Sequence, residues 1–306
     1  MQLLINSKEL RARISKAMTE EKLDVLVAMS PENVLYSSGT SIITQRMIPD
    51  RLAMVLWSRD DAQTFIVCAI EEPQARSQSW ISDIRGYIEF AESPIAVLAA
   101  AIRERGFAKG RIGIEMRYLV ASYYRQLIEL LPEAELVAAE GIFDRIRMIK
   151  TPEEIELIGN AFLATDRVIR SAFEHSHIGT TEKQVVEMLE NGIKKAGADS
   201  VAFAVLATGS NALMAHPAPS DMAIAPGYVL RTDFGGSFMG YYSDIARTAI
   251  ASPVSSRQWR NYESLITVHE RVIAAMKPGV PACDLFHLCK AEFEKLDSVQ
   301  KSVDEK

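Results

Sequence analysis

The sequence has little of what marks exported, membrane-embedded or nucleic-acid-binding proteins. Its three cysteines form no C-x-x-C pair, so reduced thiols are expected rather than a disulfide framework. The longest unbroken apolar run, Ile95 to Ile102, falls well short of the roughly 18 residues of a membrane span. Lys8 and Glu9 lie where a secretory peptide has its apolar core. The 34 basic and 40 acidic residues give a net charge of −6, against nucleic-acid binding. We therefore expect a cytoplasmic protein with neither a membrane nor a nucleic-acid partner.

Short motifs for nucleotide binding and for familiar hydrolases are also missing. The chain contains no G-x-x-x-x-G-K-[ST], G-x-G-x-x-G, G-x-S-x-G or H-E-x-x-H. The glycines of residues 235–240 have the wrong spacing for a dinucleotide loop. Nucleotide binding therefore has no support in the sequence.

The first half of the chain alternates helix-like and strand-like segments. Helices are predicted over residues 8–21, 94–105 and 118–131, and strands over 24–29, 52–57, 64–69, 111–115 and 135–138. Such alternation favours an α/β layer with a largely buried sheet. One element closes at residues 147–150 and another opens at 151–154, which predicts one domain over residues 1–146 and a second over 147–306.

The second half opens with a strong helix start. Thr151 can cap the helix, Pro152 suits the first helical position, and Glu154 completes a capping box. Thr181 and Gln184 predict the same device for a helix over 181–196. The apolar face of the first helix is predicted to contain Ile155, Ile158, Phe162, Val168, Ile169 and Phe173. Strands are then expected over residues 201–207, 228–234 and 241–251, and helices over 257–276 and 281–296.

Two aspartates carry the sharpest chemical signal. Asp233 and Asp244 lie on strand-like runs, and Gly235, Gly236 and Gly240 between them predict a glycine-rich turn. A hairpin can bring such side chains to about 5 Å, where two carboxylates repel unless a proton or a cation lies between them. Oxygen ligands favour Mg, Ca or Mn, and added imidazole widens the choice to Zn or Co. For an aspartate pair taken alone, the other interpretation is a turn cap and a solvated side chain.

His216 is the candidate catalytic residue. It precedes Pro217 in a loop after the strand over 201–207, and a residue before proline is usually extended. Loops carry many binding and catalytic side chains, although a loop histidine is also commonly a plain surface residue. The other four histidines are weaker candidates because they lie at a helix end or within helical segments: His175, His177, His269 and His287.

Five motifs in order carry a resemblance to a known family. They are R-x-x-K-T-P-E-E-I at 147–155, A-T-G-S-N-A…H-P at 207–217, D-F-G at 233–235, G-Y-Y-S-D-I-A-R-T at 240–248 and K-P-G-V at 277–280. Together they resemble the pita-bread metallopeptidases: aminopeptidase P, prolidase and the related metal-free creatinase. The resemblance covers most of the chain. It implies an α/β creatinase-like N-terminal domain followed by an α+β pita-bread catalytic domain that is incomplete at its C-terminal end.

The resemblance also implies a reaction. Two divalent ions (Mn, Co or Zn) activate a water molecule that attacks the bond before proline in a proline-containing peptide. Asp233 and Asp244 match two of the five usual metal ligands, and His216 matches a histidine that stabilises developing charge. The remaining histidine and two glutamates have no visible match, and neither Glu292 nor His287 has a reason to face the hairpin.

The missing ligands lead us to expect a truncated chain with an exposed sheet edge and apolar surface. We expect this 306-residue form to be inactive or weakly active as a peptidase, because metal affinity rises with the number of ligands. Two alternatives stay open: a metal-free creatinase-like C–N hydrolase, against which both intact aspartates argue, and a non-catalytic peptide-binding protein. A homodimer is implied by the resemblance.

Overall fold

The computed structural model describes the backbone of residues 7–48 and 50–304. Its contacts divide the chain into two compact units, which are described separately. The first contains Met1–Asp166, Ile193–Ala202 and Gly235–Asp244, and the second contains Arg167–Gly192, Phe203–Phe234 and Ile245–Lys306.

A mixed sheet organises the first unit. Within the described residues it has six strands in the order β4-β3-β2-β1-β5-β6. The strands are β1 (Val25–Ala28), β2 (Met54–Ser58), β3 (Gln63–Cys68), β4 (Asp83–Tyr87), β5 (Arg111–Ile114) and β6 (Glu135–Ala138). β2 is antiparallel to both β1 and β3, whereas β1–β5, β3–β4 and β5–β6 are parallel. The predicted α/β layer and the five predicted strands are confirmed, whereas β4 was not predicted.

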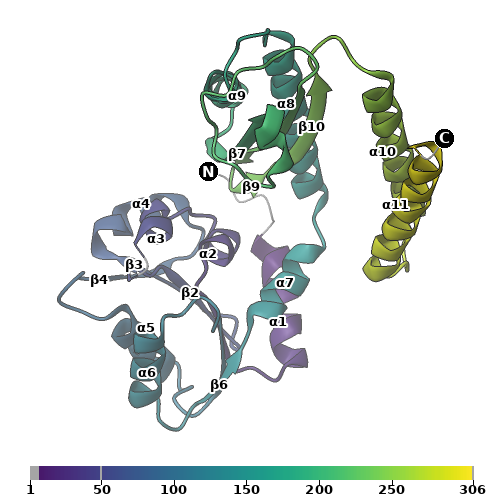
Figure 1. Cartoon of the computed structure of the whole chain (residues 1–306). Coiled ribbons are helices and arrows are strands. Elements are labelled where there is room, and N and C mark those ends of the chain that lie inside the picture. The colour runs from purple at the N-terminus through teal and green to yellow at the C-terminus, as the bar shows by residue number, and fades with distance from the viewer. Residues whose placement is uncertain (1–6, 49, 305–306) are drawn as a thin grey trace. The chain divides into compact units, whose positions relative to one another are not determined.

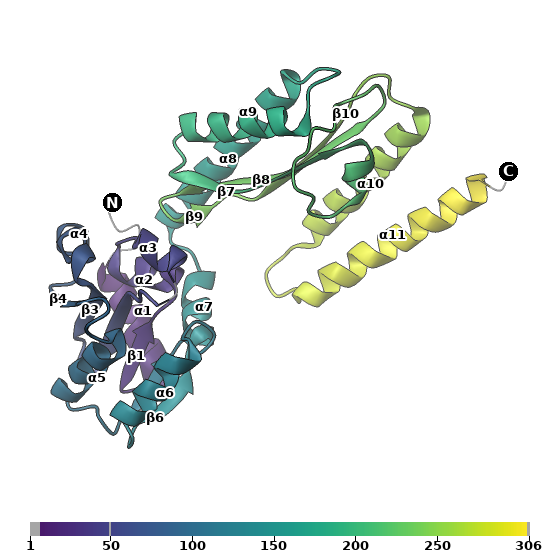
Figure 2. The same ribbon diagram turned by 60° about the vertical axis from the view of Figure 1, so that its left-hand side comes forward.

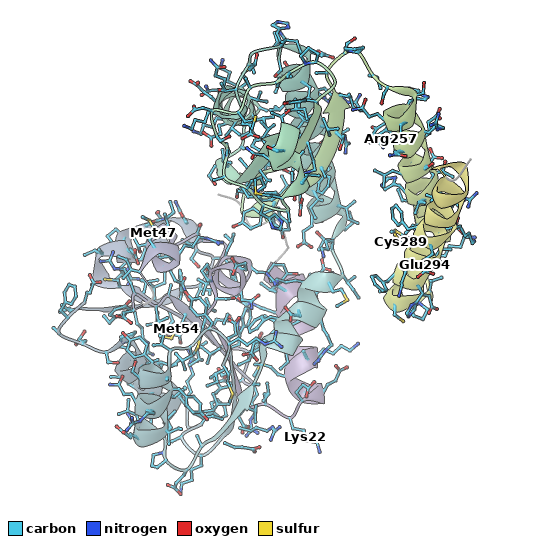
Figure 3. The ribbon with its side chains drawn as sticks, in the orientation of Figure 1. Lys22, Met47, Met54, Arg257, Cys289 and Glu294 are labelled. Atoms are coloured by element: carbon cyan, nitrogen blue, oxygen red, sulfur yellow. The ribbon has the colours of Figure 1, made fainter. Side chains whose placement is uncertain are left out.

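Helices cover both faces of this sheet. They are α1 (Ser7–Glu20), α2 (Pro31–Ser38), α3 (Ile43–Met47), α4 (Glu72–Gln78), α5 (Pro94–Glu104), α6 (Ala121–Leu130) and α7 (Glu140–Met148), with a 3₁₀ turn η1 (Ala69–Glu71). In Figures 1 and 2, α1 and α7 lie on one face, and α5 and α6 on the other. Each face has its own apolar core, one including Leu10 and Phe143, the other Leu98, Leu127 and Met54, which is labelled in Figure 3. Because both faces are covered, the central strands are continuous apolar runs.

Both predicted capping boxes are present in the next two helices, α8 (Pro152–Glu174) and α9 (Glu182–Lys195). The Thr151 hydroxyl accepts from the Glu154 amide at 3.3 Å, and the Glu154 carboxylate accepts from the Thr151 amide at 2.7 Å. Thr181 and Gln184 make the corresponding bonds at 3.3 and 2.9 Å. These starts were predictable because the interacting residues are only three positions apart.

The predicted apolar face of α8 is partly wrong. Ile155 is 61% exposed and Phe162 is 38% exposed, whereas Ile169 is fully buried as expected. Ala161 and Thr165 take part in the buried stripe instead. The Thr165 hydroxyl donates to the Ala161 carbonyl at 2.9 Å, so this polar side chain is satisfied within its own helix and can be buried. A pattern of apolar residues does not reveal such a stripe.

A second, antiparallel sheet has the order β10-β8-β7, with β9 paired to β8. Its strands are β7 (Ser200–Thr208), β8 (Val229–Phe238), β9 (Tyr241–Tyr242) and β10 (Ile245–Ile250), with a 3₁₀ turn η2 (Gly209–Leu213) after β7. The turn from β8 to β9 contains Met239 and Gly240, whose φ angles of 52° and 83° suit a two-residue hairpin.

Gly235 and Gly236 are not in that turn, contrary to the prediction; they lie inside β8. A Cβ atom on Gly236 would stand 2.7 Å from Cγ1 of Ile193. Glycine at this position therefore permits a close approach of neighbouring groups to the strand rather than a change of chain direction.

The last two helices, α10 (Ser256–Ala275) and α11 (Ala282–Asp304), run side by side in opposite directions (Figures 1 and 2). Figure 3 labels Arg257 on α10 and Cys289 and Glu294 on α11. Large apolar side chains on both helices are exposed, among them Trp259 and Phe286. These side chains lie on the two helices and not on the hairpin, so the apolar surface expected beside Asp233 and Asp244 stays a prediction. Of the helices in the described part of the chain, none has the length and hydropathy needed to cross a bilayer.

Candidate functional site

Strands β8, β9 and β10 lie together in one hairpin (Figure 2). Both predicted metal ligands belong to it: Asp233 lies in β8, and Asp244 lies between β9 and β10. Asp233 pairs with Ala246, and Ser237 pairs with Tyr242, so one register holds on both sides of the break between β9 and β10. Side chains of directly paired residues share a face, and so do residues two apart along a strand. Asp244 precedes Ala246 by two positions, so the register places its side chain on the same face of the sheet as that of Asp233.

The residue before Asp244 is fixed by an unusual ladder contact. Ser243 donates its backbone N–H to the Gly236 carbonyl, and its hydroxyl accepts from the Gly236 N–H, both at 3.0 Å. The Ser243 hydroxyl also lies 2.7 Å from that of Thr165, and each hydroxyl has a carbonyl within donating distance, that of Ala161 for Thr165 and that of Gly236 for Ser243. Ser243 is fully buried and Asp244 is exposed. The serine thus anchors the hairpin beside the carboxylate.

Burial alternates along β8 around the other aspartate. Thr232 and Phe234 are fully buried, whereas Asp233 is half-buried. The Thr232 hydroxyl donates to the Val205 carbonyl at 2.9 Å and so ties the closed face of β8 to β7. Asp233 therefore belongs to the more open face of the strand.

The loop with His216 is tied to that open face. The Arg231 guanidinium donates from Nη2 to the carbonyls of Met214 and Ala215, at 2.6 and 2.9 Å. Arg231 precedes Asp233 by two positions and shares its face. His216 follows Ala215 directly, and its side chain is exposed. The structure therefore holds the backbone next to His216 against the side of β8 that carries Asp233.

A buried glutamate that the sequence did not reveal as a site residue, Glu182, accepts hydrogen bonds from both ends of this loop. Glu182 is fully buried, and its carboxylate accepts from the amides of Thr208 and Ser220, both at 2.8 Å, and from the Ser220 hydroxyl at 2.7 Å. The Asn211 amide donates to both carboxylate oxygens, at 3.2 and 3.1 Å. Burial acts to raise the pKa of Glu182, but the hydrogen bonds from Ser220, Thr208 and Asn211 outweigh it and lower that pKa below the usual glutamate value.

The two carboxylates at the hairpin are the type of ligand that a hard divalent cation prefers, but they are fewer than such a cation usually has. Asp233 and Asp244 offer carboxylate oxygens, the donors that such ions prefer. Within the described residues, no group of three or more His, Cys, Asp or Glu side chains is arranged to hold a metal ion. Glu292 of α11 is engaged with Arg271 and Lys295. Metal binding by the two aspartates and a catalytic role of His216 remain predictions.

Two family matches together span nearly the whole chain. Residues 11–149 match the Creatinase/Prolidase N-terminal domain, and residues 156–303 match Metallopeptidase family M24. The chain therefore belongs to the pita-bread metallopeptidases, with a creatinase-type domain followed by an M24 domain. The predicted family and fold class are confirmed.

Individual relatives are Xaa-Pro peptidases by name. The chain is 26% identical over 295 residues to an Xaa-Pro dipeptidase of Lactobacillus helveticus, covering 95% of this chain and 76% of that protein. The crystallised prolidase from Pyrococcus furiosus is 26% identical, with a TM-score of 0.77, over 92% of this chain and 78% of that one. An Xaa-Pro dipeptidase from Bacillus anthracis has a TM-score of 0.83 and 24% identity over 95% and 78%, which shows the shared fold.

Proposed function

We propose that this protein is a metal-dependent peptidase of the Xaa-Pro class, with part of its metal centre on the β8–β10 hairpin. The observation that carries the proposal is the strand register, which places the side chains of Asp233 and Asp244 on the same face of the sheet. Relatives named Xaa-Pro dipeptidase and prolidase support the substrate class. The proposed substrate is a peptide with proline after the scissile bond.

In this proposal Asp233 and Asp244 converge on the open face of the hairpin and hold a divalent cation, Mn, Co or Zn. Diagonal neighbours on paired strands lie about 7 Å apart, within reach of one shared ion. The cation removes the repulsion between the two carboxylates. When bound, such ions polarise the peptide carbonyl and lower the pKa of a water molecule.

His216 has a separate role in the proposal. Its loop is fixed by Arg231 to the face of β8 that carries Asp233, and its exposed imidazole is accessible to a peptide. A ring N–H placed there donates to the scissile carbonyl oxygen as negative charge develops on it. The imidazole therefore contributes binding of the transition state rather than metal ligation.

We further propose that this 306-residue polypeptide holds metal weakly and turns over slowly or not at all. Two carboxylates are matched out of the five ligands that the resemblance implies, and affinity falls with ligand number. The dissociation constant for Mn²⁺ is expected in the range of about 10⁻⁴ to 10⁻³ M, as in weak oxygen-ligand sites.

Calorimetric titration of the full chain with Mn²⁺ tests the site. Asp244→Ala is expected to weaken binding at least about tenfold, because each carboxylate carries a full negative charge to the ion. Asp144→Ala is the matched control, since Asp144 is an exposed aspartate on α7 outside the hairpin. Equal Mn²⁺ affinity in wild type and Asp244→Ala would contradict the proposed metal pair.

Hydrolysis of an Xaa-Pro dipeptide with added Mn²⁺ tests the activity. Little or no turnover is expected; robust turnover that Asp244→Ala abolishes would refute the proposed weakness and uphold the peptidase class. Peptide binding without any metal binding would favour a non-catalytic peptide-binding protein. Hydrolysis of a C–N bond without metal would favour a creatinase-like hydrolase. The homodimer, the cytoplasmic location and the domain boundary at residue 146 stay predictions.

A further inference from the structure

We propose that Glu182 is a positioning residue: its buried carboxylate holds both ends of the loop that carries His216 and so keeps that imidazole at the face of β8 bearing Asp233. The inference rests on the proposed function and adds to it a residue that lies outside the five sequence motifs. Glu182 contacts neither aspartate nor His216 in the described contacts, so it acts through the loop.

The loop of residues 209–219 is bounded by two donors to the same carboxylate. Thr208 immediately precedes it and Ser220 immediately follows it, and both donate backbone N–H groups to Glu182. Asn211 donates from within the loop, and the Ser220 hydroxyl adds a fourth donor. A carboxylate accepts about four hydrogen bonds, so its capacity is filled by groups that belong to this loop and its two ends.

A charged residue is tolerated at this position because the fully buried carboxylate of Glu182 is surrounded by hydrogen-bond donors. A buried carboxylate is tolerated when all of its lone pairs are hydrogen-bonded, and charge-assisted bonds are stronger than neutral ones. Glu182 is also the first residue of α9, where the helix dipole favours negative charge. Its pKa is lowered despite complete burial, so the charge persists at neutral pH and the clamp is intact there.

Between the clamped ends, Arg231 provides a further attachment near His216 among the contacts of the described residues. Arg231 holds the carbonyls of Met214 and Ala215, at an exposed position where each hydrogen bond competes with water. The direction of the His216 side chain therefore depends on the buried clamp, because the Arg231 contacts alone fix only one point of the loop.

The test is the position of His216 relative to bound Mn²⁺ in Glu182→Gln. The glutamine keeps the volume but places an NH₂ group against donors. Glu187→Gln is the matched control, since Glu187 is exposed on the same helix. Paramagnetic broadening of the histidine ring signals by Mn²⁺ is measured on the full chain, and Mn²⁺ affinity is measured in parallel by calorimetry. A His216→Gln sample assigns the signal.

We expect Mn²⁺ to broaden the His216 signal in wild type and in Glu187→Gln. In Glu182→Gln the broadening should fall at least about fivefold while Mn²⁺ affinity stays within about twofold, because the aspartates do not depend on the clamp. Equal broadening in Glu182→Gln and wild type would overturn the inference. So would Mn²⁺ binding to wild type without broadening of His216, although the metal pair would then stand.

Two additions keep the outcome decisive. If Glu182→Gln does not fold, Ser220→Ala removes one of the four donors and should reduce the broadening in the same direction; no reduction would overturn the inference. If wild type binds no Mn²⁺, the proposed function is refuted, but the role of Glu182 can still be tested by ¹⁵N relaxation of the His216 amide. Higher mobility in Glu182→Gln than in Glu187→Gln would support the clamp, and equal mobility would refute it.

Discussion

The Ser243 hydroxyl offers a direct test of how the hairpin beside Asp244 is held. Ser243→Ala removes the acceptor of the Gly236 N–H and the hydrogen bond with the Thr165 hydroxyl. An unpaired buried N–H costs about 1–3 kcal/mol, and the lost hydroxyl pair about 0.5–1.5 kcal/mol. The Thr165 hydroxyl keeps its bond to the Ala161 carbonyl, so the second loss lies near its lower end. We expect a destabilisation of about 2–3 kcal/mol.

The assay is urea unfolding followed by circular dichroism, with the exchange rate of the Gly236 amide as a local probe. For an m-value of about 3 kcal/mol/M, the midpoint should fall by about 0.7–1 M in the transition that includes this sheet. Thr165→Val, which leaves the Gly236 contact in place, should cost about 1 kcal/mol. The double variant isolates the coupling between the two hydroxyls, expected at about 0.5–1 kcal/mol.

The reasoning is refuted by a specific pair of results. A loss below about 0.5 kcal/mol in Ser243→Ala, together with unchanged exchange of the Gly236 amide, would mean that the hydroxyl does not complete the ladder. A full loss with zero coupling to Thr165 would instead assign the whole effect to the Gly236 contact.

Three further changes follow from local geometry. Gly240→Ala should lower the thermal midpoint more than Gly106→Ala. Both glycines have positive φ, but only a Cβ at position 240 would clash with another side chain, that of Leu35; equal shifts would contradict this. Thr151→Ala should cost about 1 kcal/mol and Thr151→Ser far less, since serine keeps the capping hydroxyl; a chemical-denaturation series measures both. The pKa of Glu182 is lower in the folded protein than in the unfolded chain, where it is about 4.3. Its charge therefore stabilises the fold fully at pH values above the unfolded pKa, and this stabilisation is lost as the pH falls through the folded pKa. Unfolding free energies measured from pH 7 to 3 should show this loss in wild type, and Glu182→Gln should lack the part that comes from Glu182.

Local signals in the sequence predicted most of the elements. Both capping boxes, at Thr151 and Thr181, involve partners three residues away, and the central strands of the first sheet, β1 and β2, are buried and apolar on both faces. Such features depend on neighbours along the chain, so residue spacing reveals them.

Features that depend on distant partners were not predictable. Glu182 is an ordinary acidic residue in the first turn of a helix until Thr208 and Ser220, 26 and 38 residues away, are brought to its carboxylate. Gly236 was predicted to lie in a turn, but it lies in a strand where the close approach of Ile193, which is distant in the sequence, leaves no room for a side chain. The pair Asp233 and Asp244 was identified by residue type and motif, but assigning both side chains to one face needed the observed strand register.

The two-residue turn at Met239 and Gly240 restricts how this hairpin can change in length. If the turn keeps its two residues, inserting or deleting one residue between Asp233 and Asp244 moves one carboxylate to the reverse side of the ribbon, since strand side chains alternate with a period of two. A change of two residues restores the arrangement. If the two aspartates bind a cation as proposed, odd length changes that keep this turn are expected to weaken Mn²⁺ binding while keeping the sheet, and even changes to preserve it.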